Sequence, residues 1–237
     1  MPDCSNSLSQ RKAIETRTQQ AFGSLSLPTV RPFELSNWEV AFAALCGAPA
    51  LDFGQAWLPA RQETFRRGMV HLGWHGASII LAARLEDDGV FTRATADGQR
   101  LWELGDVFEI FLKDSESEEY LELHVTPGGN RSQLRFASNQ TIIDLRNGVG
   151  RIEDFAVDAP LFDFQVRTEI GRWEVLAQIP ASSLRLRVSS MEGRVMLASF
   201  SRYDYSHEGG PAVLSSTSPH AKLDFHRQHE WTTLVFC

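Results

Sequence analysis

Polar side chains able to bind a ligand are concentrated in one short stretch of the chain, residues 100–130. Trp102 precedes a strand-like segment that contains Glu109, and Glu122 and His124 alternate along the next such segment. Side chains of a strand point alternately to opposite faces, so these polar residues face away from the apolar residues between them. An aromatic ring can stack on an apolar ligand face, while carboxylates and imidazole bind hydroxyl groups. The stretch therefore predicts a binding surface for a hydroxylated ligand.

Each of these residues also has an interpretation that involves no ligand. A carboxylate between apolar residues is costly unless it is paired, so Glu109 could instead form a buried ion pair with Arg135 or Arg167. Trp102 could be a core or lid residue, and the polar residues of the second strand could lie on a solvated sheet face. The ligand interpretation is favoured for Glu109, and the choice for the others stays open.

Further along the chain lie other candidates for the same site. Arg135 follows on the next predicted strand, where its guanidinium could donate two bonds to adjacent hydroxyls or pair with Glu122. Arg202, Tyr203 and Tyr205 form an RYDY cluster whose side chains alternate. The cluster could contribute to the site, or its tyrosines could pack over the sandwich edge.

A metal site and a catalytic site are both less well supported. The acidic residues Glu86, Asp87, Asp88 and Asp106 supply the oxygen ligands that Ca²⁺ prefers, but without EF-hand spacing, so a solvated acidic turn is favoured and no cofactor is expected. The sequence lacks the GxSxG, HExxH and GxxxxGK[ST] motifs.

Two more groups of residues could in principle act in catalysis or metal binding, but the sequence does not favour either role. Glu109 and Glu122 could form a glycosidase pair only at a carboxylate separation of about 5–10 Å, which a sequence does not give. The histidines at 220, 226 and 229 lie in a polar segment without ligand spacing and are interpreted as solvated.

Composition narrows the class of protein. The 237 residues carry a net charge of −7, which argues against nucleic-acid binding. No apolar run approaches the roughly 20 residues of a membrane-spanning helix, and the first residues lack the apolar core of a secretory signal. Taken as complete, the sequence predicts a cytoplasmic protein. Three widely spaced cysteines, Cys4, Cys46 and Cys237, do not suggest a disulfide framework.

The order of elements predicts an all-β protein, an antiparallel β-sandwich. Residues 1–24 are polar and predicted to be a flexible lead-in, and residues 25–237 form one domain. Strands are expected at 78–85, 106–112, 120–125, 132–136, 141–145, 162–170, 173–179, 195–202 and 231–236, with a helical turn at 181–184. Residues 203–226 are expected to be irregular, and no helix of convincing length is predicted.

Several motifs, taken together, resemble the family 9 carbohydrate-binding modules and their relatives with a DOMON-like sandwich. They are LEDDG at 85–89, LWxxGDVFEIFL at 101–112, YxExHxxPxG at 120–129, WEV at 173–175 with IP at 179–180, and the closing strand at 195–202 followed by YD and SP. The similarity spans about residues 53–236, and its strength lies in the order and spacing of motifs that are individually weak.

The resemblance implies a sandwich that binds a mono- or oligosaccharide without catalysis and in some members holds structural calcium. It also implies that the segment of Arg202 and Tyr203 supplies a second aromatic wall for the sugar. A haem-binding DOMON-type domain is an alternative, with Met69, His71 or Met196 as loose axial candidates. A third possibility is an interaction domain of the same fold without a ligand.

Overall fold

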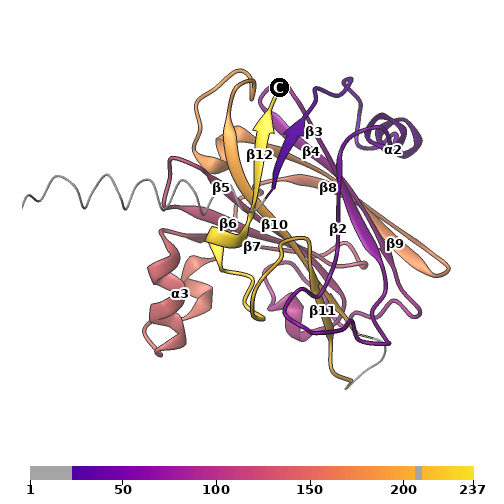
Figure 1. Ribbon diagram of the computed structural model, residues 1–237, viewed down its shortest axis with the longest axis vertical. Coiled ribbons are helices and arrows are strands. Elements are labelled where there is room, and N and C mark those ends of the chain that lie inside the picture. Colours follow the sequence, from indigo (N-terminus) through magenta and orange to yellow (C-terminus); the bar gives the residue numbers. More distant parts are fainter. Residues whose placement is uncertain (1–22, 206–209) are drawn as a thin grey trace, which may run out of the picture.

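The computed structural model describes residues 23–205 and 210–237, which form a sandwich of two sheets (Figure 1). The first sheet has the order β1 (Ser24–Leu27), β12 (Thr232–Phe236), β10 (Val195–Asp204), β5 (Val107–Asp114), β6 (Tyr120–Val125) and β7 (Arg131–Phe136), with β11 (Val213–Ser216) also paired to β10. The second has the order β2 (Ala50–Asp52), β3 (Gly68–His75), β4 (Ser78–Glu86), β9 (Arg172–Pro180) and β8 (Asp163–Glu169). Among the strands of the described residues, β1 and β12 pair in parallel and all other pairs are antiparallel, as predicted.

The core between the sheets follows the predicted alternation. Phe108, Ile110 and Leu112 of β5 and Leu121 and Leu123 of β6 are fully buried in it. Their sequence neighbours point to the outer face of the first sheet, because successive side chains of a strand alternate. The prediction of which residues build the core is confirmed.

Most predicted strands are present, and the local turn chemistry explains where they end. Gly171 has φ +79° between β8 and β9, a left-handed conformation that favours glycine in a tight hairpin. Pro180 is the last residue of β9, and the helical turn predicted after it is a 3₁₀ turn, Ala181–Leu184. The predicted lead-in, residues 1–24, lies outside the described residues except for its last two. The last of these, Ser24, is already the first residue of β1.

Two predictions of local structure are wrong. Residues 141–145 were expected to be a strand but lie in helix α3, Asn139–Arg146, which ends at Asn147 and Gly148. Another helix, α2 (Trp38–Leu45), was not expected, nor was strand β11 in the segment predicted as irregular.

Additional segments cover the outer faces of both sheets. Helix α2 packs on the second sheet through Ala41, Phe42 and Leu45. Helix α3 contacts β7 and places Ile142 in a cluster on the outer face of the first sheet. The loop before β12 adds Phe225 and Trp231 to this cluster. In the described part of the chain no helix is long and apolar enough to cross a membrane.

Candidate functional site

A pocket of about 380 Å³ opens on the outer face of the first sheet. This volume is within the range of about 300–1,000 Å³ that small-molecule sites occupy. Strands β5, β6 and β10, the 3₁₀ turn Leu101–Glu103, helix α3 and the loop before β12 all contribute side chains. The lining residues are Trp102, Glu109, Phe111, Glu122, Arg146, Ile152, Tyr203, Leu214, Leu223, Asp224, Phe225 and His226.

The predicted residues of β5 and β6 form the pocket floor. Glu109 lies opposite His124 in the strand register. His124 Nε2 is 2.8 Å from Glu122 Oε1 and 3.4 Å from Glu109 Oε1, so one imidazole contacts both carboxylates. All three residues are at most 6% exposed, which contradicts a solvated sheet face for Glu122 and His124. Glu109 also makes no ion pair with either arginine that was considered.

Burial and mutual charge set the ionisation of the two carboxylates. Burial, with a smaller contribution from the charge of Glu122, raises the pKa of Glu109 well above its usual value. Burial also opposes ionisation of Glu122, but His226 and His124 outweigh it and hold the pKa of Glu122 below its usual value. Burial thus favours the neutral form of Glu109, whereas the neighbouring histidines favour the ionised form of Glu122.

Aromatic side chains form the walls. The ring of Trp102 meets that of His124 edge to face, with centroids 5.2 Å apart. Tyr203 of β10 packs edge to face on Phe225 at 6.0 Å. Tyr205 donates a hydrogen bond from its hydroxyl to the carbonyl oxygen of Trp102, at 2.7 Å, and so holds the turn that carries the tryptophan. The structure thus brings Trp102 and Tyr203 to the same pocket.

Several pocket residues were not found by sequence reasoning. Arg146 of α3 donates two hydrogen bonds to the carboxylate of Asp224, at 3.0 and 2.8 Å. His226 places Nδ1 2.9 Å from the hydroxyl of Tyr120 and Nε2 3.6 Å from Glu122 Oε2. These residues are about 100 positions from β5 and β6 or lie in an unexpected helix, so no local spacing pointed to them.

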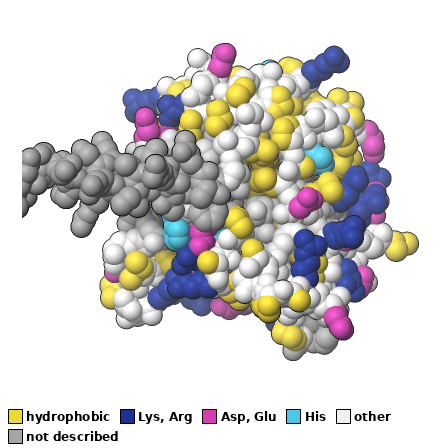
Figure 2. Space-filling model, viewed as in Figure 1, with side chains coloured by type: hydrophobic (Ala, Val, Ile, Leu, Met, Phe, Trp, Pro, Cys, Tyr) yellow, Lys and Arg dark blue, Asp and Glu magenta, His cyan; other side chains and the backbone are white. Residues whose placement is uncertain are grey.

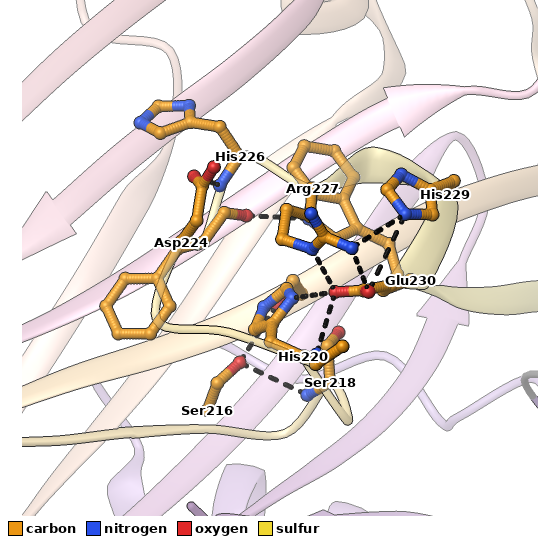
Figure 3. A network of polar contacts seen from close by, with 12 residues as sticks. Ser216, Ser218, His220, Asp224, His226, Arg227, His229 and Glu230 are labelled. Atoms are coloured by element: carbon orange, nitrogen blue, oxygen red, sulfur yellow. Dashed lines mark hydrogen bonds and ion pairs between the residues drawn. The ribbon is translucent and has the colours of Figure 1, made fainter. Parts of the chain in front are cut away.

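A buried ionic cluster anchors the loop that carries Asp224, Phe225 and His226 (Figure 3). Glu230 accepts two hydrogen bonds from Arg227, at 2.7 and 2.6 Å, and lies 3.1 Å from His220 Nδ1. Burial opposes ionisation of Glu230, but Arg227 and His220 outweigh it and lower the pKa of Glu230 to about 2. His220 is fully buried and His226 lines the pocket, so the solvated interpretation is correct only for His229.

Arg135 is not part of this pocket. It lies opposite Leu121 in the register of β7 and β6, on the face that points into the sandwich. Its guanidinium donates to Glu119 Oε1 at 2.6 Å and to the carbonyl oxygen of Ser183 at 2.7 Å. The arginine therefore ties β7 to the 3₁₀ turn after β9, and does not pair with Glu122.

Arg202 also lies elsewhere, on the opposite face of β10 from Tyr203. It is 1% exposed and contacts Asp87 Oδ2 at 2.9 Å and Asp204 Oδ2 at 3.1 Å. Carboxylate oxygens of Asp87, Asp106 and Asp204 lie within 4.8 Å of one another. Burial raises the pKa of Asp106 to about 7 and that of Asp204 to about 6.

The predicted solvated acidic turn is therefore wrong for Asp87 and Asp106, which are buried. Asp88 remains exposed and pairs with Arg66. The guanidinium of Arg202 supplies positive charge to the cluster where calcium had been considered.

The residues considered for haem do not converge. Met69 and His71 alternate with the core residues of β3, and His71 Nδ1 lies 3.1 Å from the carbonyl oxygen of Ala48. Met196 is buried between the sheets, on the strand β10 of the other sheet.

Other surface features are weaker candidates for a binding site. A larger hollow, about 660 Å³, is lined by residues 33–36, 127–129, 131, 163–166 and 178, and by none of the predicted site residues. Arg131 in this hollow already bonds Asp97 and the carbonyl oxygen of Phe162. On the face shown in Figure 2, charged side chains of both signs are interspersed with hydrophobic ones.

Comparison with known proteins gives matches only among solved structures. No family model matches the chain, and a search of curated proteins finds no match. A Bacteroides uniformis protein provisionally described as carbohydrate-binding superposes with a TM-score of 0.71 at 18% identity, over 91% of this chain and 99% of that one.

A family 9 carbohydrate-binding module from Caldicellulosiruptor kristjanssonii superposes in two complexes at 11% identity. The cellotriose complex gives a TM-score of 0.57 over 90% of this chain and 93% of the module, and the glucose complex gives 0.58 over 90% and 95%. The chain therefore has the β-sandwich fold that is seen in family 9 carbohydrate-binding modules.

Proposed function

We propose that the chain is a non-catalytic carbohydrate-binding module that takes a mono- or oligosaccharide into the pocket on the first sheet. One observation carries the proposal: Trp102 and Tyr203 from distant segments meet Glu109 and Glu122 in a single pocket. Sugars present C–H groups on their faces and hydroxyls on their edges. Aromatic walls above a floor of carboxylates match both kinds of surface.

In this proposal the floor and rim have different tasks. Glu122 accepts hydrogen bonds from sugar hydroxyls, and Glu109 accepts them as a carboxylate and also donates when it holds a proton. His124 touches both carboxylates and positions them. Arg146 and Asp224, which form the rim of the pocket, supply a donor and acceptors through their paired side chains. They take the role that was expected of Arg135 and Arg202.

The geometry favours binding over hydrolysis. A glycosidase needs a free space of about 5–10 Å between its two carboxylates for the scissile bond. In this pocket His124 contacts both Glu109 and Glu122, so an imidazole fills that position. The likeness to structures that hold glucose and cellotriose agrees with a binding role.

A glycan array followed by calorimetry tests the proposal. We expect saturable binding of at least one sugar, weakened about tenfold or more by Trp102→Ala and by Glu109→Ala. Trp38→Ala is the matched control, because Trp38 lies in α2 on the outer face of the other sheet. The proposal is lost if no sugar binds, or if both pocket variants bind as the unaltered protein does.

A further inference from the structure

Among the described residues, no lysine or arginine pairs with the two floor carboxylates. In the described part of the chain Arg146 is the one Lys or Arg that lines the pocket, and both of its hydrogen bonds go to Asp224. The contacts of Glu109 and Glu122 with ring nitrogens come from His124 and, at 3.6 Å, from His226. A bound molecule therefore meets two carboxyl groups without a guanidinium or ammonium partner.

One atom of the floor also lacks a hydrogen bond. Oε2 of Glu122 is buried and has no hydrogen-bond partner among the described residues. Nε2 of His226 lies 3.6 Å from this oxygen, beyond hydrogen-bond distance. A buried acceptor left unpaired costs about 1–3 kcal/mol, so a ligand that brings a donor to this oxygen gains affinity.

The walls favour the same kind of donor. Trp102, Phe111, Tyr203 and Phe225 line the pocket with aromatic rings. The negative face of an aromatic ring attracts a cation, and a cationic donor adds the attraction of opposite charges to its hydrogen bond with a carboxylate. A carboxylate on the ligand would instead be repelled by the floor.

We propose, building on the carbohydrate-binding function, that the pocket prefers a sugar with a free, protonated amino group over neutral and acidic sugars. The ammonium group binds on the pocket side of Glu109 and Glu122, opposite the imidazole of His124, and donates to Glu122 Oε2. The hexose ring and its remaining hydroxyls meet the aromatic walls and the rim. The ligand class is thus a hexosamine without an N-acetyl group.

Binding of an ammonium group changes the protonation of the floor. The raised pKa of Glu109 favours the protonated carboxyl group in the empty pocket, and a cation beside it favours loss of that proton. A neutral sugar has no such effect. The other titratable or charged groups around Glu109 come from β6, β10, α3 and the loop before β12: Glu122, His124, Tyr203, Arg146, Asp224 and His226.

A metal ion fits the same atoms less well. Single ligand atoms of Glu109, Glu122 and His124 lie within 4.8 Å of one another. A metal would take the lone pair of His124 Nε2 and leave a proton on Nδ1, which is buried without a partner among the described residues. Metal-bound histidines nearly always donate this proton to a neighbour.

Calorimetry with three matched disaccharides provides the test. They are a β-1,4-linked glucosamine dimer, its N-acetylated form and cellobiose, which share the linkage and differ in charge. We expect the free amino sugar to bind about tenfold more tightly than either neutral one. Repeating the titration in two buffers of different ionisation enthalpy should show proton release with the amino sugar alone, a readout that needs no variant.

Variants then test whether the two floor carboxyl groups cause the preference for the amino sugar. Glu109→Gln and Glu122→Gln keep the side-chain shape and should bring the affinity ratio of amino to neutral sugar close to one. Glu174→Gln, a buried glutamate on the other sheet, should leave the ratio unchanged. Equal affinity for the three sugars overturns the preference but leaves the proposed function intact, whereas no binding to any sugar overturns both. Binding that EDTA abolishes points to a metal and also overturns the preference.

Discussion

Nε2 of His124 lies 3.4 Å from Glu109 Oε1 across the β5–β6 ladder and 2.8 Å from Glu122 Oε1 on its own strand. One imidazole thus links two buried carboxyl groups whose pKa values are shifted in opposite directions. A floor of this kind is sensitive to pH, and its effect on stability can be measured without a ligand.

We expect Glu109→Gln to stabilise the protein relative to the unaltered chain increasingly as pH rises. The folded-state pKa of Glu109 is above the unfolded value of about 4.3, so its contribution is complete below that pH and is lost as pH rises through the folded pKa. Glutamine does not titrate and avoids this loss, which is at most about 1.4 kcal/mol per pH unit. Urea unfolding between about pH 5 and 8 measures the difference.

Glu122→Gln serves as the control for this series. The pKa of Glu122 is lowered, so its contribution is present above about pH 4.3 and is lost only as pH falls. The difference between this variant and the unaltered protein should therefore change less over the same pH range, and only through the effect of Glu122 on the pKa values of Glu109 and His226. A difference for Glu109→Gln that stays constant would show that its carboxyl group does not titrate there.

Removal of Arg202 should be strongly destabilising. Arg202→Met leaves the buried carboxyl groups of Asp87 and Asp204 without their cation, and breaking a buried pair typically costs about 3–5 kcal/mol. Arg100→Met removes a more exposed arginine that pairs with Glu103 and Glu153, for which we expect a much smaller loss because solvent screens exposed ion pairs. Urea unfolding of both variants gives the comparison, and similar losses would contradict it.

Calcium should not stabilise the unaltered protein. The acidic cluster of Asp87, Asp106 and Asp204 already contains the guanidinium of Arg202, which contacts two of its members. Calcium at 100 times its Kd would add about 2.7 kcal/mol of stability if a specific site were present. We expect thermal unfolding to give the same Tm with calcium and with EDTA, and a clear rise with calcium would contradict this.

The alternation of side chains along a strand predicts which residues share the pocket face and which do not. It placed Glu109, Glu122 and His124 on the outer face of the first sheet. The same alternation separates Arg202 from Tyr203, because adjacent residues of a strand cannot face the same side. Arg135 lies across from Leu121 and shares its inward face. Knowledge of the register would have moved both arginines out of the site.

Helix α3 shows why other parts could not be predicted. Its Thr141, Ile142 and Ile143 are β-branched and favour a strand, yet contact with β7 makes the segment helical. Only Ile142 is buried among its eight residues, so no helical apolar stripe is visible in the sequence. For this reason the sequence did not predict that Arg146 lines the pocket. Asp224 and His226 could not be predicted either, because long-range packing of a polar loop brings them to the pocket.

The ionic cluster behind the pocket loop should control affinity without touching the ligand. Glu230→Gln weakens the bonds to Arg227 and His220, which hold the loop of Asp224 and His226. We expect a loss of about 1.5–3 kcal/mol in stability together with weaker sugar binding. The lowered pKa of Glu230 means that the stability difference should shrink as pH falls through about 2.

His229→Gln is the matched control for this prediction, because His229 is exposed and lies 3.6 Å from the same carboxylate. It should change neither stability nor affinity appreciably. Normal sugar affinity in a folded Glu230→Gln protein would show that the cluster does not position the loop.

Tyr120 should fix the tautomer of His226. Burial raises the pKa of Tyr120, so its hydroxyl keeps its proton and can donate it to His226 Nδ1 at 2.9 Å. The proton of the neutral imidazole is then on Nε2, on the side of Glu122. Tyr120→Phe removes this donor, so we expect the ¹⁵N shifts of His226 to show a larger share of the Nδ1-protonated form and sugar affinity to fall several-fold. An unchanged tautomer in the variant would show that Glu122 alone orients the ring.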